Sequence, residues 1–501
     1  MFGLGDLSPY RIEHHGQVFY GNVSLRDFHV FEYDDALFLV NVESMAVYPI
    51  SKEVENLLNR IAALSDRLIL ESEIRELRKF QLIAGEDDDL PEFPPAGEMG
   101  RSQSKHDYII DNISLFLAQE CNMRCVYCYG GDGEYGLKGM MSEETAFRAV
   151  DWLMANSGSA ETVRICFFGG EPLLNFSLMK KIVKYARQQA GQHGKTVAFS
   201  MTTNGSLLRN EVISFIKSQD IDPVISFDGP PEYQNRQRPF KGGRGSYNKV
   251  LANVRKLKAV RPYLRARATV YGDADPLRIK ESADLAGFSS CLIEKASPSI
   301  LNRLTPEAPE DGSQERMSRR LIAYYHEETH KLLAAIRKRS IDIHCPPDLF
   351  LAMSSVALKR KRHHGCGVGK RMVGITITGD IYPCHRFAGQ EDQRIGNISD
   401  YRVDGANEYY RSTVDTLPEC RKCWARYFCG GGCFYHNLAH TGDMHWPEAL
   451  DCEERRAMYE GLIRVYCQLD EDEKLYVKRL LEGSYAQGET MSESSTSKLE
   501  Q

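Results

Sequence analysis

The 501-residue chain has 42% hydrophobic and 26% charged residues, the ordinary balance of a globular protein. Its net charge of −6 argues against general nucleic-acid binding, and we find no apolar run long enough for a membrane span. The N-terminus lacks the basic and apolar regions of a signal peptide, so we expect a cytoplasmic protein. In that compartment its 14 cysteines are expected to serve as metal or redox ligands rather than disulfides.

Residues 1–84 are predicted to form a small winged-helix-like module. The segments FHVFEY, ALFLVNV and AVYPI indicate short strands, and KEVENLLNRIAAL and SDRLILESEIRELRKF indicate two helices. Residues 1–92 carry 18 acidic and 8 basic side chains, a net charge of −10, which suits either a basic partner or a plain solvated surface. Residues 85–107 are acidic and then rich in Pro, Gly and Ser, and they are predicted to be a linker.

Strands and helices alternate through residues 108–300. The strand candidates are IIDNISLFLA, VRICFF, VAFSM, PVISF, RARATV and CLIEK, with helical stretches between them. This alternation predicts an α/β fold with a parallel sheet, as in an incomplete barrel. In such folds the chemistry lies at the carboxyl ends of the strands, so the residues that follow each strand are the first candidates for a site.

The remaining chain is predicted to divide into four parts. Residues 301–365 form a bridging segment with an inserted helix, and residues 366–452 form a domain rich in cysteine and glycine. A single C-terminal helix is expected over 453–484, followed by a polar, disordered tail at 485–501.

Cys121, Cys125 and Cys128 follow the first predicted strand with the spacing CxxxCxxC. Three thiolates can hold three irons of a [4Fe–4S] cluster, and the fourth iron then remains open to an outside ligand. The alternatives are buried thiols or a zinc site, but zinc requires a fourth ligand close by, which the next residues do not offer. The triad therefore predicts a cluster that can take part in a reaction.

Glycine and polar residues follow the next strands. FGGEP ends the second strand, MTTNG the third and ISFDG the fourth, and Arg267 lies on the fifth, where it suits a carboxylate. Taken alone, each glycine-containing segment could be a strand-ending turn, the ring of Tyr127 could simply be packed, and Arg267 could lie on the surface. Together, these residues predict one pocket. The candidate binding residues are Tyr127, Gly169, Gly170, Glu171, Asn204, Ser226, Asp228 and Arg267.

Seven further cysteines form a second array, with CxxC spacing at its centre. CxxC pairs suit zinc as well as iron, so the spacing alone leaves the metal open. Four other cysteines fall outside both patterns and are most simply structural thiols. The array consists of Cys366, Cys384, Cys420, Cys423, Cys429, Cys433 and Cys452, and the others are Cys166, Cys291, Cys345 and Cys467.

The triad, the GGEP turn and the polar strand ends resemble the radical S-adenosylmethionine (SAM) enzymes. The resemblance covers about residues 108–300 and implies a partial (β/α)6 barrel, in which SAM chelates the open iron and yields a 5′-deoxyadenosyl radical. It also implies three sets of SAM contacts: to the amino group from Gly169, Gly170 and Glu171, to the ribose or carboxylate region from Ser226, and to the carboxylate from Arg267.

The second array resembles the SPASM domain, which holds two auxiliary [4Fe–4S] clusters, so three clusters are implied in all. SPASM proteins act on peptides, and the N-terminal module resembles the leader-recognition element of peptide maturases, to whose edge strand a leader peptide adds. The implied ligands of one auxiliary cluster are Cys420, Cys423, Cys429 and Cys452. Those of the other are Cys366, Cys384 and Cys433, with a fourth position that is open or filled by Cys345.

Position 385 separates two kinds of peptide maturase. Anaerobic sulfatase maturases have a catalytic Asp after the YPC cysteine, where this chain has His385, which can act as a base near neutral pH. They also have an extra cysteine soon after the first of the array, which is missing after Cys366. The chain is closer to the thioether-forming maturases of cysteine-rich peptides.

The expected function is a radical SAM maturase that forms Cys thioether cross-links in a ribosomally made precursor peptide. The peptide would carry a leader and a cysteine-rich core, flavodoxin or ferredoxin would be the reductant, and no nucleic acid or membrane would be involved. Three alternatives remain: oxidation of Cys or Ser to formylglycine, epimerisation or C–C cross-linking of a peptide, and a non-enzymatic zinc or iron–sulfur protein with a structural or electron-transfer role.

Overall fold

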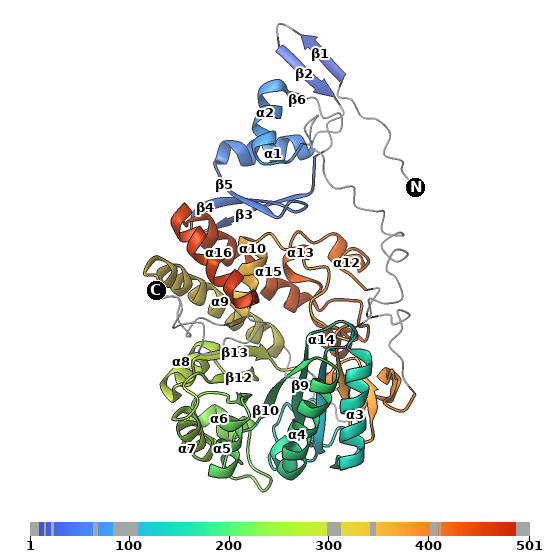
Figure 1. Cartoon of the computed structure of the whole chain (residues 1–501). Coiled ribbons are helices and arrows are strands. Elements are labelled where there is room, and N and C mark those ends of the chain that lie inside the picture. Colours follow the sequence, from blue (N-terminus) through green and yellow to red (C-terminus); the bar gives the residue numbers. More distant parts are fainter. Residues whose placement is uncertain are drawn as a thin grey trace.

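The computed structural model describes residues 10–14, 17–21, 25–63, 69–83, 109–297, 312–340, 347–400, 409 and 412–486. Figure 1 shows three regions in space: the N-terminal module, a layer of helices from the second half of the chain, and a sheet with its own helices. The predicted linker, the predicted tail from residue 487 onwards and Cys345 lie outside the described residues. Within the described part, no helix is both long and apolar enough to cross a membrane.

Six parallel strands form the centre of the largest sheet, and they confirm the expected α/β fold with a parallel sheet. Strand β7 is buried at seven of its eight positions, as expected for a strand covered on both faces. In spatial order the strands are β7 (Asn112–Gln119), β9 (Thr162–Gly169), β10 (Thr196–Thr203), β11 (Ile221–Ser226), β12 (Arg265–Val270) and β13 (Ser290–Lys295).

Beyond β7 the same sheet continues into the cysteine-rich region. β14 (Met372–Ile375) pairs with β7 in parallel, and β15 (Asp380–Tyr382) and β16 (Gly396–Asn397) follow in antiparallel order. A short strand, β8 (Gly139–Met140), pairs with the other end of β7. The strand that leads into the cysteine triad is therefore hydrogen bonded to the region that carries the second array.

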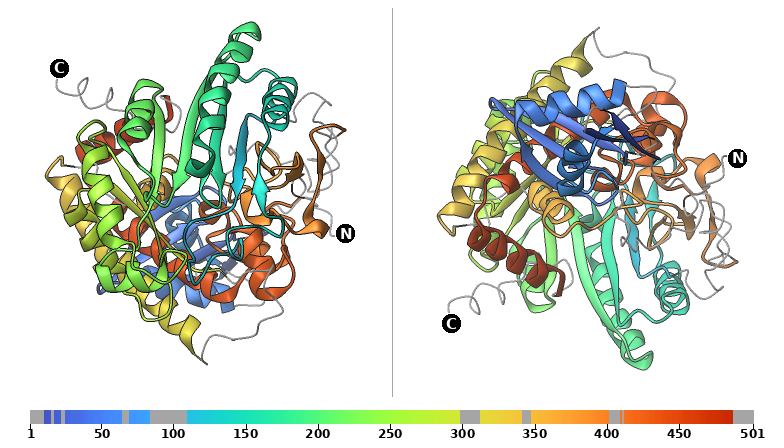
Figure 2. Two further views of the ribbon diagram at one scale, coloured as in Figure 1. Left: turned by 90° about the horizontal axis from the view of Figure 1, so that it is seen from below. Right: turned by 90° about the horizontal axis from the view of Figure 1, so that it is seen from above.

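Helices connect the parallel strands and bury their apolar faces against the sheet (Figure 2). Their sequences carry ordinary helix signals: Ser142 caps the first of them through its hydroxyl, and Asp275 caps the last. The helices are α3 (Glu143–Asn156), α4 (Phe176–Gln192), α5 (Asn210–Ser218), α6 (Pro231–Gln237), α7 (Tyr247–Lys258) and α8 (Pro276–Ala286).

A helical layer lies between the sheet and the N-terminal module (Figure 1). It contains α9 (Ser313–Arg337), α10 (Pro347–Ala357), α15 (Ala449–Cys467) and α16 (Glu471–Ala486). The single C-terminal helix expected over 453–484 is wrong, because the chain forms two helices there. The backbone N–H of Asp470 donates to the Glu473 carboxylate and that of Glu473 donates to Asp470, a reciprocal cap that begins a new helix.

The cysteine-rich region is built from short elements. Most are a single turn, and they hold the cysteines in loops or at helix ends. The elements are η2 (His385–Phe387), η3 (Glu391–Gln393), α12 (Pro418–Arg421), α13 (Arg426–Cys429) and α14 (Phe434–Thr441).

The N-terminal module contains the three predicted strands, β3 (Phe28–Tyr33), β4 (Ala36–Asn41) and β5 (Ala46–Ile50), as an antiparallel sheet. The helix α1 (Lys52–Ala63) also agrees with its prediction. The second predicted helix is shorter: α2 (Glu71–Lys79) begins only after β6 (Ile69–Leu70). Strand β6 joins an unpredicted hairpin of β1 (Tyr10–His14) and β2 (Gln17–Gly21).

Aromatic and charged contacts dock this module on the cysteine-rich region. The His29 ring stacks on Trp424 at 4.4 Å, with the planes 4° apart. Arg426 forms ion pairs with Asp27 and Glu43. Part of the module's acidic charge is therefore used within the protein, rather than being available to a partner.

Candidate active site

The cysteine triad lies in the loop between β7 and β8, at the carboxyl end of β7. Burial raises the pKa of Cys121 to about 11 and that of Cys125 to about 12, and the neighbouring thiols of the triad add to both shifts. Such thiols stay protonated until a metal displaces their protons, and binding a metal would release them. Their burial and their mutual influence therefore fit a shared metal centre.

Sulfur spacing separates a cluster from a single zinc ion. Among the described residues, no three cysteine sulfurs all lie within 4.8 Å of one another. Four sulfurs around one zinc ion, at Zn–S distances of about 2.3 Å, would lie only about 3.8 Å apart. No group of three or more cysteines among the described residues has this spacing.

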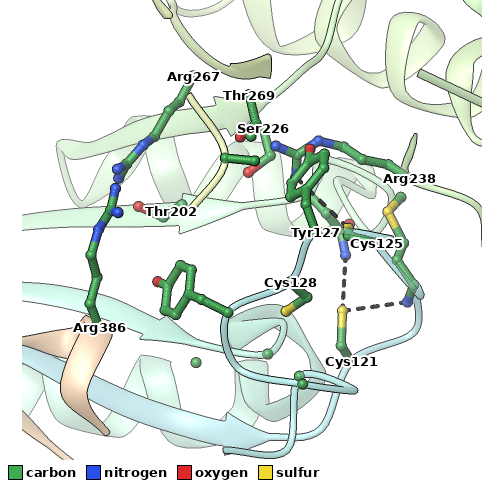
Figure 3. A pocket seen from close by; sticks show the side chains of 18 of the residues that line it. Cys121, Cys125, Tyr127, Cys128, Thr202, Ser226, Arg238, Arg267, Thr269 and Arg386 are labelled. Carbon is green, nitrogen blue, oxygen red and sulfur yellow. Dashed lines mark hydrogen bonds between the residues drawn. The ribbon is translucent and has the colours of Figure 1, made fainter. Parts of the chain in front are cut away.

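A cavity of about 140 Å³ opens beside the triad, at the carboxyl ends of the parallel strands (Figure 3). Six of the eight candidate binding residues line it, so strands far apart in sequence contribute to one pocket. These six are Tyr127, Gly169, Gly170, Asn204, Ser226 and Arg267. Asn204 also donates a hydrogen bond toward the sulfur of Cys121, at 3.8 Å.

Glu171 does not line the cavity and is fully buried, contrary to the expected contact with an ammonium group. Its carboxylate accepts hydrogen bonds from the backbone N–H of Leu173, the hydroxyl of Thr203 and the backbone N–H of Asn204. Burial raises the pKa of Glu171 to about 7, although these three donors oppose the shift. The residue joins the ends of β9 and β10 and holds the pocket wall in place.

Asp228 is also fully buried and positions other groups instead of lining the cavity. Its carboxylate accepts hydrogen bonds from the Tyr127 hydroxyl and the Thr269 backbone N–H, and it forms a 3.0 Å ion pair with Nε of Arg238. The Arg238 guanidinium lies over the Tyr127 ring and approaches the Cys125 sulfur to 4.0 Å. Asp228 and Arg238 therefore fix Tyr127 beside the triad.

On the opposite wall, Arg267 and Arg386 point toward each other (Figure 3). Both form ion pairs with the carboxylate of Glu294, at the end of β13. Burial raises the pKa of Glu294, but the two guanidinium charges outweigh it and bring the pKa to about 2. The carboxylate that Arg267 meets in the structure therefore belongs to the protein.

Three lining residues, Glu294, Arg386 and Ser297, were missed by sequence reasoning. The first lies on the weakest predicted strand, where the strand-end rule does point to it. The other two depend on long-range packing, since the Arg386 guanidinium donates to the Ser297 hydroxyl across the chain at 3.2 Å. No local pattern identifies such a pair.

The two glycines of the GGEP turn are needed for packing between strand ends. Gly169 has φ +127°, and a Cβ there would lie 2.2 Å from the carbonyl oxygen of Ala118. At Gly170 a Cβ would lie 2.3 Å from the carbonyl oxygen of Glu120. The turn can therefore lie directly against the loop that carries the triad only if both residues are glycine.

Gly170→Ala is expected to lower the stability by about 1–3 kcal/mol, because backbone atoms must move to admit the methyl group. SAM affinity should fall as well, since this turn lines the pocket. Gly191→Ala, on α4 with nothing within 4 Å of the added carbon, is the control and should be neutral or slightly stabilising. Thermal unfolding measures the stability, and equilibrium dialysis measures the affinity for SAM. Equal stability and equal SAM affinity of the two variants would contradict the close packing of Gly170 against the triad loop.

The second array separates into two groups in the structure. The thiols of Cys433 and Cys366 both add to the burial that raises the pKa of Cys384 to about 12. Likewise, burial raises the pKa of Cys420 to about 12, and the thiols of Cys429, Cys452 and Cys423 add to this shift. These are the same two groups that the SPASM resemblance implies, with three and four cysteines.

His385 lies beside the first of these groups, packed on Phe168 at a ring distance of 4.5 Å. Within the described part of the protein, both of its ring nitrogens are buried without a hydrogen-bond partner. Burial, followed by the charges of Arg267 and Arg386, lowers the pKa of His385 to about 3. An imidazole in this environment is a weak base, which does not favour the expected role in proton removal.

The triad loop and the cysteine-rich region are in direct contact. The ring of Tyr129 lies 5.8 Å from that of Tyr435 and 6.3 Å from that of His385. A Cβ at Gly389 would lie 2.1 Å from the carbonyl oxygen of Tyr135. The two cysteine arrays are therefore held by one continuous packed unit.

Residues 115–272 match the family model of the Radical SAM superfamily. The match starts within β7 and ends just after β12, so it includes the triad, the GGEP turn and most of the pocket. This part of the chain therefore resembles a radical SAM domain, a type of domain that implies SAM and a [4Fe–4S] cluster.

Two of the curated relatives each match about 30% of the chain. An uncharacterized protein of Methanocaldococcus jannaschii is 32% identical over 148 residues, which cover 30% of this chain and 49% of the relative. The serine-type anaerobic sulfatase-maturating enzyme of Bacteroides thetaiotaomicron is 31% identical over 143 residues, covering 28% of this chain and 34% of the relative. The matched region therefore spans about half of the first relative and a third of the second.

Among solved structures, the fold is similar to that described as native anSMEcpe with bound AdoMet. The TM-score is 0.60 at 18% sequence identity, over 71% of this chain and 98% of the other. The likeness extends beyond the radical SAM domain, and at this identity it concerns the fold.

Proposed function

We propose that the protein is a radical SAM peptide maturase that forms Cys thioether cross-links in a ribosomally made precursor peptide. The position of Cys384 carries the proposal. Cys384 is the N-cap of η2, and Arg386, in the same short helix, lines the pocket beside the triad. A peptide in that pocket would lie between the two cysteine arrays.

Each part of the pocket has a defined task in this proposal. When bound, SAM and its cluster supply the radical that removes hydrogen from a substrate carbon. Cys121, Cys125 and Cys128 would hold the cluster, while Asn204 and Ser226 present polar groups to SAM from the strand ends. The packed aromatic rings around the triad loop exclude water from the reacting atoms.

We assign the two groups of the second array to two auxiliary [4Fe–4S] clusters, which would bring the total to three. Four cysteines would complete one cluster, whereas Cys366, Cys384 and Cys433 would leave one position for another ligand. An open position suits a thiol from the substrate, because binding to iron favours the thiolate form. The thiolate would bond to the substrate carbon radical, and the one electron lost in forming the carbon–sulfur bond would pass to the auxiliary clusters.

The N-terminal module is proposed to bind the leader of the peptide. Within the described residues, β3 and β5 are the outer strands of their sheet, and outer strands are where a peptide can add by main-chain hydrogen bonds. A flavodoxin or ferredoxin is the proposed electron donor.

A co-expressed cysteine-rich precursor peptide tests this function. Each thioether should remove two hydrogens from the peptide mass and protect one cysteine from alkylation, because C–H and S–H bonds are replaced by C–S. High-resolution mass spectrometry with iodoacetamide treatment measures both. Formation of an aldehyde would support formylglycine chemistry instead, and an unchanged mass with altered chirality would indicate epimerisation.

Formylglycine formation is the second candidate, because one of the relatives is a sulfatase-maturating enzyme. The environment of His385 weighs against it, since a base is required near the substrate and this imidazole has a strongly lowered pKa. We therefore place thioether formation first.

A further inference from the structure

Three metal-binding side chains meet where the N-terminal module contacts α9. Asp34 lies in the turn between β3 and β4, and His326 and His330 lie four residues apart on α9, so they share one face of the helix. One ligand atom of each residue lies within 4.8 Å of the others. This group is separate from all ten cysteines assigned above to iron–sulfur clusters.

The distances in this group suit a metal ion better than hydrogen bonds. Nε2 of His326 lies 3.6 Å from Oδ1 of Asp34, and Nε2 of His330 lies 3.4 Å from Oδ2. Both distances exceed the usual 2.7–3.2 Å range of a hydrogen bond. Two ligand atoms on one tetrahedral zinc ion, each at about 2.0–2.1 Å, lie about 3.3–3.4 Å apart, and Nε2 of His330 and Oδ2 of Asp34 have this spacing.

Histidine is the commonest metal ligand in proteins. The side chains of His326, His330 and Asp34 are 51%, 41% and 37% exposed, so an ion can reach them.

Neighbouring residues orient the ligands. The Tyr33 ring stacks on His326, with centroids 5.0 Å apart and planes 18° apart. Nη1 of Arg464 lies 3.1 Å from Oδ2 of Asp34, and the guanidinium itself lies over the Tyr33 ring. Hydrogen bonds from such outer partners to metal-bound carboxylates are a regular feature of metal sites.

We propose that Asp34, His326 and His330 bind a zinc ion, with water completing the tetrahedron, and that this ion fastens the N-terminal module to α9. The two imidazoles and one carboxylate match the ligand preference of zinc. Because Asp34 comes from the module and the histidines come from α9, zinc would hold two distant parts of the chain together. The site stands independently of the reaction performed in the SAM pocket.

The test counts zinc in the iron-loaded, full-length protein. Wild type and His326→Gln/His330→Gln are dialysed against buffered micromolar zinc, and zinc and iron are measured together by mass spectrometry. Wild type should retain about one more zinc ion per chain than the double variant, with equal iron in both. Zinc should also raise the thermal unfolding temperature of wild type but not that of the double variant.

Two single variants sharpen the comparison. Asp34→Asn keeps the shape of the turn residue but should weaken zinc binding at least about tenfold. Glu315→Gln changes a charge in the first turn of the same helix, away from the two histidines, and it should bind zinc as wild type does. Equal zinc in wild type and the double variant would overturn the proposal, as would zinc uptake accompanied by loss of iron, because the zinc would then occupy cysteines.

Discussion

Cys125→Ala is expected to abolish the formation of 5′-deoxyadenosine from SAM. The variant removes one of only three thiols at the triad, so the cluster loses a protein ligand and should not assemble. Since enzymes commonly accelerate their reactions by 10⁶-fold or more, we expect the rate to fall by at least about 10³-fold, to background. Anaerobic incubation with dithionite and SAM, followed by chromatography, measures the product.

The iron content shows whether Cys125→Ala removes only the cluster at the triad. The variant should contain about four fewer iron atoms per chain than wild type, because only one cluster is removed. Cys467→Ala is the matched control: this thiol, like that of Cys125, is partly buried, and burial raises its pKa to about 12, but it belongs to neither array. Wild-type cleavage of SAM by Cys125→Ala would remove the basis for the proposed cluster.

The parallel sheet could be predicted because it depends on local pattern. The six strands are short segments rich in apolar or β-branched residues, and the triad and the GGEP turn follow the first two strands directly. Strand ends converge in any parallel sheet, so six of the eight candidate residues could be assigned to one pocket from sequence alone.

The two candidate residues outside the cavity share a physical feature. Glu171 and Asp228 are polar residues at strand ends, as a ligand-binding residue would be, but their carboxylates are satisfied by backbone and side-chain donors inside the protein. Arg267 faces the pocket as expected, yet its partner Glu294 comes from β13. Sequence patterns identify the position of a side chain on a strand, but not which long-range partner it meets.

The prediction of a single C-terminal helix was wrong for a related reason. Apolar periodicity continues from Glu453 to Leu481, so one long helix was the simplest interpretation. The reciprocal cap of Asp470 and Glu473 interrupts it, and a capping signal inside a periodic run is easily missed. The β1–β2 hairpin was not predicted, although Tyr10 and Ile12 alternate with Arg11 and Glu13 in its first strand.

Cys384→Ala is expected to separate the two halves of the proposed reaction. The triad and the SAM pocket retain all their own residues, so cleavage of SAM should remain within a few-fold of wild type. Cross-linking should fall by at least about 100-fold, equivalent to about 2.7 kcal/mol of transition-state stabilisation, because the site proposed to hold the substrate thiol is lost. Mass spectrometry of the peptide and chromatography of 5′-deoxyadenosine, performed on the same reactions, measure both.

The position of Cys384 makes this experiment sensitive to misfolding, since its sulfur accepts a hydrogen bond from the Arg386 backbone, and Arg386 lines the pocket. Cys433→Ala provides an independent check, because it belongs to the same group of three cysteines but lies outside η2. Both variants should lose about four iron atoms and the cross-link while keeping SAM cleavage. Cross-linking at the wild-type rate in either variant would show that this group does not handle the substrate thiol, and the choice of product would then depend on the SAM pocket alone.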